Sequence, residues 1–273
     1  MEVGVSTACF YPMRTEQAVE EIKKTKAGCV EVFLEARSEY DPEYCKRLKE
    51  RLDEAGIRVV SVHGFVAGYE PFLFSEYERR AKDALEEFQM VLEAARILGA
   101  KLNTFHGNRL EAYTKDFDFK KYAEKFDLLC SVAEEKGIQI SWENVSWCQS
   151  GNLEFLNKSL EWIRSNNFGF TLDLKQAARA NYNYSEYLKI FKNRLLNVHI
   201  SDLNDKSTCL LPGNGTQNFH RIYKDLRALC YDRALIIEVY HDAFYDTKEV
   251  IESVEFLKNI IETGENKSNL SLN

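Results

Sequence analysis

The sequence predicts a single-domain α/β protein built as a closed (β/α)8 barrel, and three observations lead to this fold class. Eight short runs rich in β-branched and aromatic residues recur along the 273 residues, and a stretch with helical periodicity follows each run. Each strand and its helix take about 34 residues, which suits a barrel of eight units. The chain has no G-x-G-x-x-G after its first strand and no G-x-x-x-x-G-K-[ST], so an open doubly wound sheet is the weaker alternative.

The expected strands are short runs of mainly β-branched and aromatic residues. In chain order they cover residues 3–10, 29–35, 57–63, 101–106, 138–143, 168–173, 195–200 and 234–240. A strict order of strand, helix and strand predicts that all of them run parallel, with right-handed crossovers between neighbours.

The expected helices carry apolar residues three or four positions apart. They cover residues 15–26, 42–55, 75–98, 117–136, 153–165, 184–191, 219–230 and 246–261. Gly56, Gly99 and Gly137 each follow a helical run and precede a strand, as expected of a glycine that ends a helix in the left-handed conformation. These glycines therefore mark turns from a helix into the next strand.

The composition is that of one ordinary globular domain, with 45% apolar and 29% charged residues and only 4 prolines. No linker-like stretch interrupts the repeat, so we expect residues 1–263 to form one barrel that carries the active site. A polar, frayed tail is expected at 264–273.

The cellular setting is predicted from what the chain lacks. No apolar run approaches the roughly 20 residues that a membrane span needs, and the N-terminus lacks the pattern of a signal peptide. The 7 cysteines are an odd number without a C-x-x-C pair, which fits reduced thiols. We therefore expect a cytoplasmic protein without a membrane partner. The net charge of −7 gives no general attraction to nucleic acid, and the sequence leaves a homo-oligomer open.

Polar residues close six of the expected strands, at the end where a (β/α)8 barrel builds its active site. They are His63, His106, Glu143, Asp173, His199 and Glu238. Taken singly, each is more often a solvated side chain or a helix cap than a ligand. Their coincidence at the same end of six consecutive strands favours one shared site.

The chemistry that these side chains permit is divalent-metal binding. Two Glu, one Asp and one His offer three anionic oxygen donors and one imidazole, which suits Mn²⁺, Co²⁺ or Mg²⁺ at least as well as Zn²⁺. His63 and His106 could hold substrate oxygens, or complete a second metal site together with Glu143. Glu31 and Glu35, on the second strand, are candidates to support the ligands or are plain carboxylates at the mouth.

A series of short motifs runs from Val5 to about Leu257 in the order V-H-G, F-H-G-N, W-E-N-V, L-D-L-K-Q-A, V-H-I-S-D, L-P-G-N-G and I-I-E-V. This order resembles the sugar phosphate isomerase/epimerase family of xylose isomerase-like barrels, which is related to the abasic-site endonucleases. The resemblance implies one metal ion, held by Glu143, Asp173, His199 and Glu238. It also implies that the two glutamates form the acid/base pair.

The chain departs from the family pattern after the sixth strand. The motif D-x-x-H usually stands there, but the four residues from Asp173 read D-L-K-Q, so Gln176 replaces a histidine that the isomerases direct toward the substrate. The endonucleases also have D-x-H ahead of their G-x-G loop, where this chain has Ser207 and Cys209. These replacements and the acidic net charge count against the endonuclease branch.

We predict a metal-dependent isomerase or epimerase of a sugar, sugar phosphate or related polyol. Glu143 and Glu238 approach the mouth from opposite sides, so they can move a proton while the metal stabilises the enediolate; which of them takes the proton is open. The side chains expected to contact the substrate are His63, His106, Trp142, Lys175 and Gln176. The alternatives are a metal-dependent hydrolase or lyase, abasic-site endonucleases included, and a barrel that binds a sugar without converting it.

Overall fold

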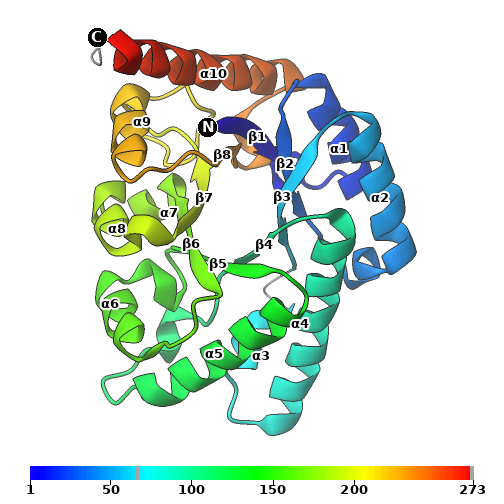
Figure 1. Ribbon diagram of the computed structural model, residues 1–273, viewed down its shortest axis with the longest axis vertical. Helices are drawn as coiled ribbons and strands as arrows, with labels where there is room; N and C mark the ends of the chain where they lie inside the picture. Colours follow the sequence, from blue (N-terminus) through cyan, green and yellow to red (C-terminus); the bar gives the residue numbers. More distant parts are fainter. Residues whose placement is uncertain (66–67, 271–273) are drawn as a thin grey trace.

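The strands form a closed parallel barrel in the computed structural model, which describes residues 1–65 and 68–270, with 266–270 as backbone alone (Figure 1). The strand order is the chain order, β1 to β8, and β8 closes the barrel by pairing with β1. The prediction of a single (β/α)8 barrel is confirmed.

The eight strands are short and lie close to the expected positions. They are β1 Glu2–Ser6, β2 Cys29–Phe33, β3 Arg58–His63, β4 Leu102–Phe105, β5 Gln139–Glu143, β6 Phe168–Asp173, β7 Leu195–Ile200 and β8 Ala234–Ile237. In this register Asp173 lies beside His199, and His199 lies beside Ile236 of β8. The carboxyl ends of β5 to β8 therefore meet on one side of the mouth.

Helices surround the strands on the outside, as Figure 1 shows. The long ones are α1 Thr15–Lys24, α2 Pro42–Glu54, α4 Glu78–Leu98, α5 Phe119–Glu135, α6 Leu153–Trp162, α8 Tyr184–Phe191, α9 Phe219–Ala228 and α10 Thr247–Leu270. Gly56, Gly99 and Gly137 have φ of 67°, 80° and 68°, so each adopts the left-handed conformation expected of it. None of the described helices combines the length and apolar character that spanning a bilayer requires.

Several boundaries differ from the prediction. The first strand ends at Ser6, because the Ser6 side chain accepts a hydrogen bond from the Ala8 N–H and turns Thr7–Phe10 into a 3-10 helix. Two short helices of the loops, α3 Glu70–Leu73 and α7 Leu174–Arg179, were not predicted.

The C-terminal helix is longer than predicted. Helix α10 continues through Leu270, so most of the polar segment expected to fray from residue 264 is helical; residues 271–273 lie outside the described part of the chain. The tertiary structure supplies the reason, because α10 packs against α9 and Gly264 lies so close that an added Cβ would be 2.2 Å from the Tyr223 ring. A helix anchored in this way extends easily through polar residues.

Apolar side chains fill two separate regions. The main core lies between the strands and the surrounding helices. A smaller cluster gathers side chains from strands on both sides of the barrel, and its members are Cys29, Val60, Leu102, Leu196, Ala234 and Ile236. Since these strands are not all neighbours, the cluster must lie inside the barrel, and the polar residues at the carboxyl ends are the layer above it.

Candidate metal centre

Four side chains from the ends of four strands converge at the mouth of the barrel. Glu143 ends β5, Asp173 ends β6, His199 lies in β7 and Glu238 follows β8 directly. One ligand atom from each lies within 4.8 Å of all the others. The structure thus brings together the four side chains that the resemblance implies as metal ligands.

His199 presents one ring nitrogen to the three carboxylates. Its Nδ1 lies 3.5 Å from Glu143 Oε1, 3.7 Å from Asp173 Oδ2 and 3.5 Å from Glu238 Oε1. Its other nitrogen, Nε2, lies 3.1 Å from Glu31 Oε2. When Nε2 carries the proton and donates a hydrogen bond to Glu31, the Nδ1 lone pair is available to a metal ion.

Glu31 is a buried carboxylate beneath this cluster. Its Oε2 accepts hydrogen bonds from Thr104 Oγ1 at 2.8 Å, from Asn197 Nδ2 at 3.1 Å and from the Ser61 hydroxyl. Burial raises the pKa of Glu31, but the His199 ring, with smaller contributions from His63 and Ser61, outweighs burial and holds this pKa at about 2. Glu31 therefore stays ionised and orients His199, one of the two roles that the sequence leaves open for it.

Ligand-type atoms of the cluster are buried and lack hydrogen-bond partners among the described residues. They are Glu143 Oε2, Asp173 Oδ2, His199 Nδ1 and Glu238 Oε2. Burial lowers the pKa of His199, but the carboxylates of Glu238, Glu31 and Glu143 outweigh burial and raise it well above its usual value. Within the described chain, Asp173 Oδ2 and Glu143 Oε2 have only ion-pair contacts, the shortest with Lys175 and His106 respectively. The ligand atoms that converge here fit a divalent cation, which would satisfy them together.

A second group adjoins the first and shares Glu143 with it. His106 Nε2 lies 2.8 Å from His63 Nε2 and 3.0 Å from Glu143 Oε2. Burial and the neighbouring His106 lower the pKa of His63 to about 4, so the His63 ring is neutral. Burial lowers the pKa of His106, but the Glu143 carboxylate outweighs burial and raises it. His63, His106 and Glu143 could hold a second ion, as the sequence suggests.

Lys175 and Gln176 lie in the first turn of α7, and Gln176 is the residue that departs from the family pattern. The Lys175 side chain is 2% exposed, and its Nζ lies 3.1 Å from Asp173 Oδ2 and 3.5 Å from Glu238 Oε1. The Gln176 Oε1 accepts hydrogen bonds from Ser146 N at 3.2 Å and Ser146 Oγ at 2.8 Å. Lys175 thus reaches the acidic cluster directly, while Gln176 is held by Ser146 through its amide oxygen.

The structure contradicts the predicted substrate contact of Trp142. This side chain is fully buried in the outer core, with its ring 4.9 Å from that of Phe126 and 6.2 Å from that of Phe170. Successive residues of a strand point to opposite faces, so Trp142 must face the helices because Glu143 faces the mouth.

Glu70 is a buried site residue that sequence reasoning missed. Its Oε2 accepts hydrogen bonds from the backbone N–H groups of His106 and Gly107, both at 2.8 Å. It lies in the loop after β3, and no periodic pattern distinguishes it from a solvated glutamate. Glu70 holds the end of β4 in place and so positions His106.

The buried carboxyl group of Glu70 should make the stability of the metal-free protein depend on pH. Burial raises the pKa of Glu70 from 4.5 to about 8. Its contribution to stability is therefore fully present below about pH 4.5 and is lost as the pH rises through about 8. Between pH 5 and 8 we expect Glu70 alone to lower the free energy of unfolding by about 3 kcal/mol.

Urea denaturation with chelator at both pH values measures this effect. Glu70→Gln keeps an oxygen that accepts the two N–H groups but cannot ionise, so its stability should fall less between pH 5 and 8 than that of the wild type. Other groups with raised pKa values, such as His199, act equally in both proteins. Equal pH slopes for the two proteins would show that folding does not raise the pKa of Glu70.

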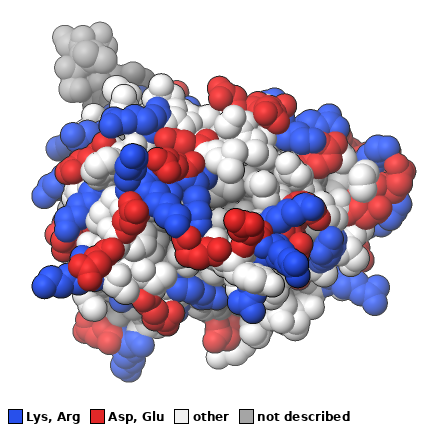
Figure 2. Space-filling view, turned by 90° about the horizontal axis from the view of Figure 1, so that it is seen from below, with Lys and Arg blue, Asp and Glu red and all other residues white. Residues whose placement is uncertain are grey.

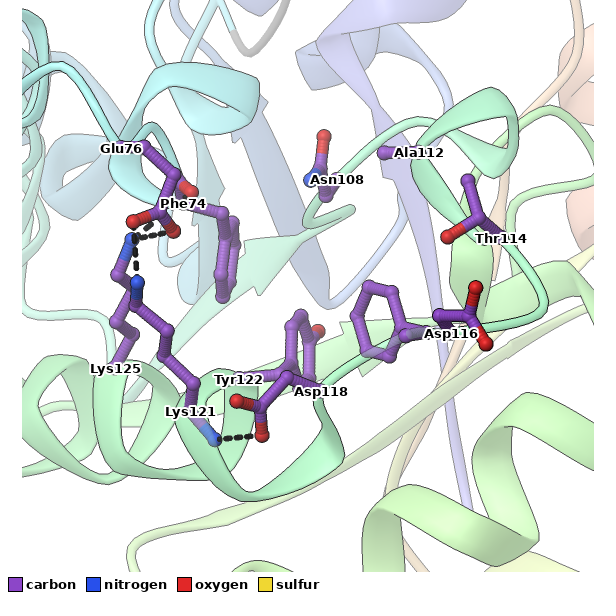
Figure 3. Close-up of a pocket in the computed structure, with 11 residues that line it drawn as sticks. Phe74, Glu76, Asn108, Ala112, Thr114, Asp116, Asp118, Lys121, Tyr122 and Lys125 are labelled. Carbon is purple, nitrogen blue, oxygen red and sulfur yellow. Dashed lines mark hydrogen bonds and ion pairs between the residues drawn. The ribbon is translucent and has the colours of Figure 1, made fainter.

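A cavity of about 430 Å³ lies between the loops that follow β3 and β4 and the start of α5 (Figure 3). Figure 3 shows Lys121 and Lys125 reaching toward Glu76 on one side and Thr114 and Asp116 on the other. None of the side chains of the acidic cluster lines it. This cavity is therefore distinct from the candidate metal centre.

Comparison with known proteins identifies the family. A family model described as xylose isomerase-like TIM barrel matches residues 19–260. The chain belongs to the xylose isomerase-like TIM barrel family. This confirms the resemblance that the order of the sequence motifs indicates.

Relatives within this xylose isomerase-like family include sugar epimerases. The chain is 24% identical over 254 residues to 3-dehydro-D-guloside 4-epimerase of Escherichia coli (strain K12), covering 87% of this chain and 92% of that protein. A crystal structure of a D-tagatose 3-epimerase-like protein matches with a TM-score of 0.82 and 23% identity, over 98% of this chain and 100% of that one. The IOLI protein, solved with a zinc atom, matches with a TM-score of 0.75 and 17% identity, over 96% and 99%.

Proposed function

We propose that this protein is a metal-dependent sugar isomerase or epimerase, which moves a proton at the carbon next to a sugar carbonyl. The observation that carries the proposal is the convergence of Glu143 and Glu238 with Asp173 and His199 at the barrel mouth. Two carboxylates in one buried cluster can serve as the base and the acid of such a reaction. The relative named as an epimerase of a dehydro sugar supports this class of chemistry.

We propose that the two glutamates act on opposite faces of the substrate. They come from β5 and β8, which are not neighbours in the barrel, and an oxygen of each lies 3.5 Å from the same His199 nitrogen. A carbon held between them can lose its proton to one carboxylate and receive one from the other. Such a proton exchange inverts the configuration at that carbon or moves the carbonyl group to the neighbouring carbon.

A divalent ion bound by the four ligands would act as a Lewis acid and lower the cost of the negative charge that develops on the substrate oxygens. We propose Glu143, Asp173, His199 and Glu238 as its ligands, and Mn²⁺, Co²⁺, Mg²⁺ or Zn²⁺ as the ion. The donor set of three carboxylates and one imidazole supports this choice. A second ion at His63, His106 and Glu143 belongs to the same proposal.

The substrate that we propose is a keto sugar or a related polyol. His106 and Lys175 lie beside the carboxylates of Glu143 and Asp173, and each can donate a hydrogen bond to a sugar oxygen. The neutral His63, whose Nδ1 donates to the Gly64 carbonyl, can accept a hydrogen bond through Nε2. Gln176 would contact the substrate through its amide nitrogen. These side chains suit a small polyhydroxylated molecule.

The surface charge does not favour nucleic acid as the substrate. On the face shown in Figure 2, lysine and arginine side chains alternate with acidic ones, and the net charge of the chain is −7. A protein that follows a phosphate backbone usually carries a continuous basic surface. This argument ranks the endonuclease alternative below the isomerase.

Solvent exchange tests the proposal. The wild-type protein, supplied with Mn²⁺, is incubated in deuterated water with a panel of keto sugars, aldoses, their phosphates and inosose-like polyols. We expect deuterium at the carbon next to the carbonyl of the productive substrate, detected by NMR and mass spectrometry. Turnover without deuterium in the product would indicate a hydride shift between adjacent carbons in place of proton transfer. No turnover across the panel by metal-loaded protein would favour a sugar-binding barrel or a substrate class outside the panel.

A further inference from the structure

The proposed function uses Lys175 as a substrate contact but leaves the charge of its buried ammonium group without a role. The residue is the second of α7, two positions after the end of β6, and the first turn of this helix carries its side chain to the carboxylates of the cluster. Its Nζ approaches two carboxylates of the cluster, Asp173 and Glu238, and lies 5.1 Å from the centre of the Tyr240 ring. A buried lysine needs such partners, because an isolated ammonium group in a protein interior is costly.

The two oxygens of Asp173 have different roles. Oδ1 accepts the Gln176 backbone N–H at 2.8 Å and so caps the first turn of α7. Oδ2 is the oxygen that remains for a metal ion, and the same atom lies 3.1 Å from Lys175 Nζ. The lysine and a metal ion must therefore share, or compete for, one carboxylate oxygen.

Glu238 repeats this arrangement on the other side of the cluster. Its Oε1 lies 3.5 Å from Lys175 Nζ and 3.5 Å from His199 Nδ1. Lys175 thus links the end of β6 to the end of β8 through two carboxylates that belong to the metal centre. It is placed to balance their negative charge before any metal arrives.

We propose that Lys175 is a built-in cation of the metal centre, which stabilises the metal-free protein and weakens the binding of the divalent ion. The inference rests on the metal site of the proposed function and adds a role for a residue within it. In the metal-free protein the ammonium group offsets the repulsion between Asp173 and Glu238. In the metal-bound protein its charge repels the ion over a short, poorly screened distance.

The test compares Lys175→Met with the wild type in metal affinity and in stability. Competition with a chelating dye should show Mn²⁺ and Zn²⁺ binding at least about tenfold more tightly to Lys175→Met, because one repelling charge is gone. With chelator present, Lys175→Met should melt about 5 °C or more below the wild type, because its carboxylates lose their cation. Saturating metal should remove most of this difference.

Two controls separate charge from packing. Lys175→Arg keeps the charge, so it should bind metal like the wild type within about threefold. Lys82→Met removes a lysine charge from an exposed position of α4, where the side chain is 77% exposed, and should change neither property. Lys175→Gln is measured beside Lys175→Met, and both neutral variants should behave alike.

The outcomes distinguish this inference from the proposed function. Equal or weaker metal binding by Lys175→Met, with normal binding by the wild type, overturns the role of Lys175 and leaves the metal site standing. No divalent binding by any of the proteins overturns the metal site and the inference together. If both neutral variants stay unfolded even in saturating metal, the lysine acts through packing and the inference is wrong.

Discussion

Replacing Glu143 or Glu238 with glutamine is expected to lower turnover of the productive sugar by about 10²-fold or more. Glutamine has nearly the shape of glutamate but can neither take nor deliver the proton. The same variants should lose solvent deuterium incorporation in proportion to turnover. Steady-state kinetics and NMR of the product measure the two effects.

Metal content separates proton transfer from metal binding in these variants. Each glutamine keeps one oxygen that can act as a ligand, so we expect at least one of the two variants to retain its ion. Glu86→Gln, on the exposed surface of α4 with a side chain 59% exposed, is the matched control and should keep full turnover. If both glutamine variants bind metal and still exchange deuterium at the wild-type rate, neither glutamate is the acid or the base of the reaction.

Removing a metal ligand should empty the centre. Protein purified without chelator should carry close to one tightly held divalent ion, whereas Asp173→Asn and His199→Ala should each lose most of it. His199→Ala should also cost roughly 3 to 5 kcal/mol of stability in the metal-free state, because it leaves buried Glu31 without its cationic partner. Elemental analysis by mass spectrometry and urea denaturation measure the two effects.

Exposed positions provide controls for the ligand variants. Asp205→Asn and His220→Ala make the same chemical changes at surface residues outside the cluster and should keep the ion. Full occupancy in both Asp173→Asn and His199→Ala would show that the ion, if bound, lies elsewhere. Lower occupancy in the controls as well would indicate general loss of fold.

The barrel and the membership of the cluster could be predicted because both depend on local patterns. Strand and helix periodicity is set by residues near one another in sequence, and strict alternation requires parallel strands. Parallel strands bring their carboxyl ends to the same side, so Glu143, Asp173, His199 and Glu238 meet although they are far apart in the chain. The left-handed conformation of Gly99 and the other helix-ending glycines could also be predicted, because it is a local property of the backbone.

Only the tertiary structure decided how the side chains are used. Trp142 faces the helices, Glu31 holds the far nitrogen of His199, and Glu70 binds the backbone at His106. These contacts join residues from different units of the barrel, and local periodicity does not encode which of them meet. Lys175 is the clearest case: the sequence shows a lysine next to a replaced histidine, but the cap at Asp173 and the turn of α7 bury its charge among the carboxylates. A charge has its effect through the distances and burial of its neighbours, which the folded barrel alone provides.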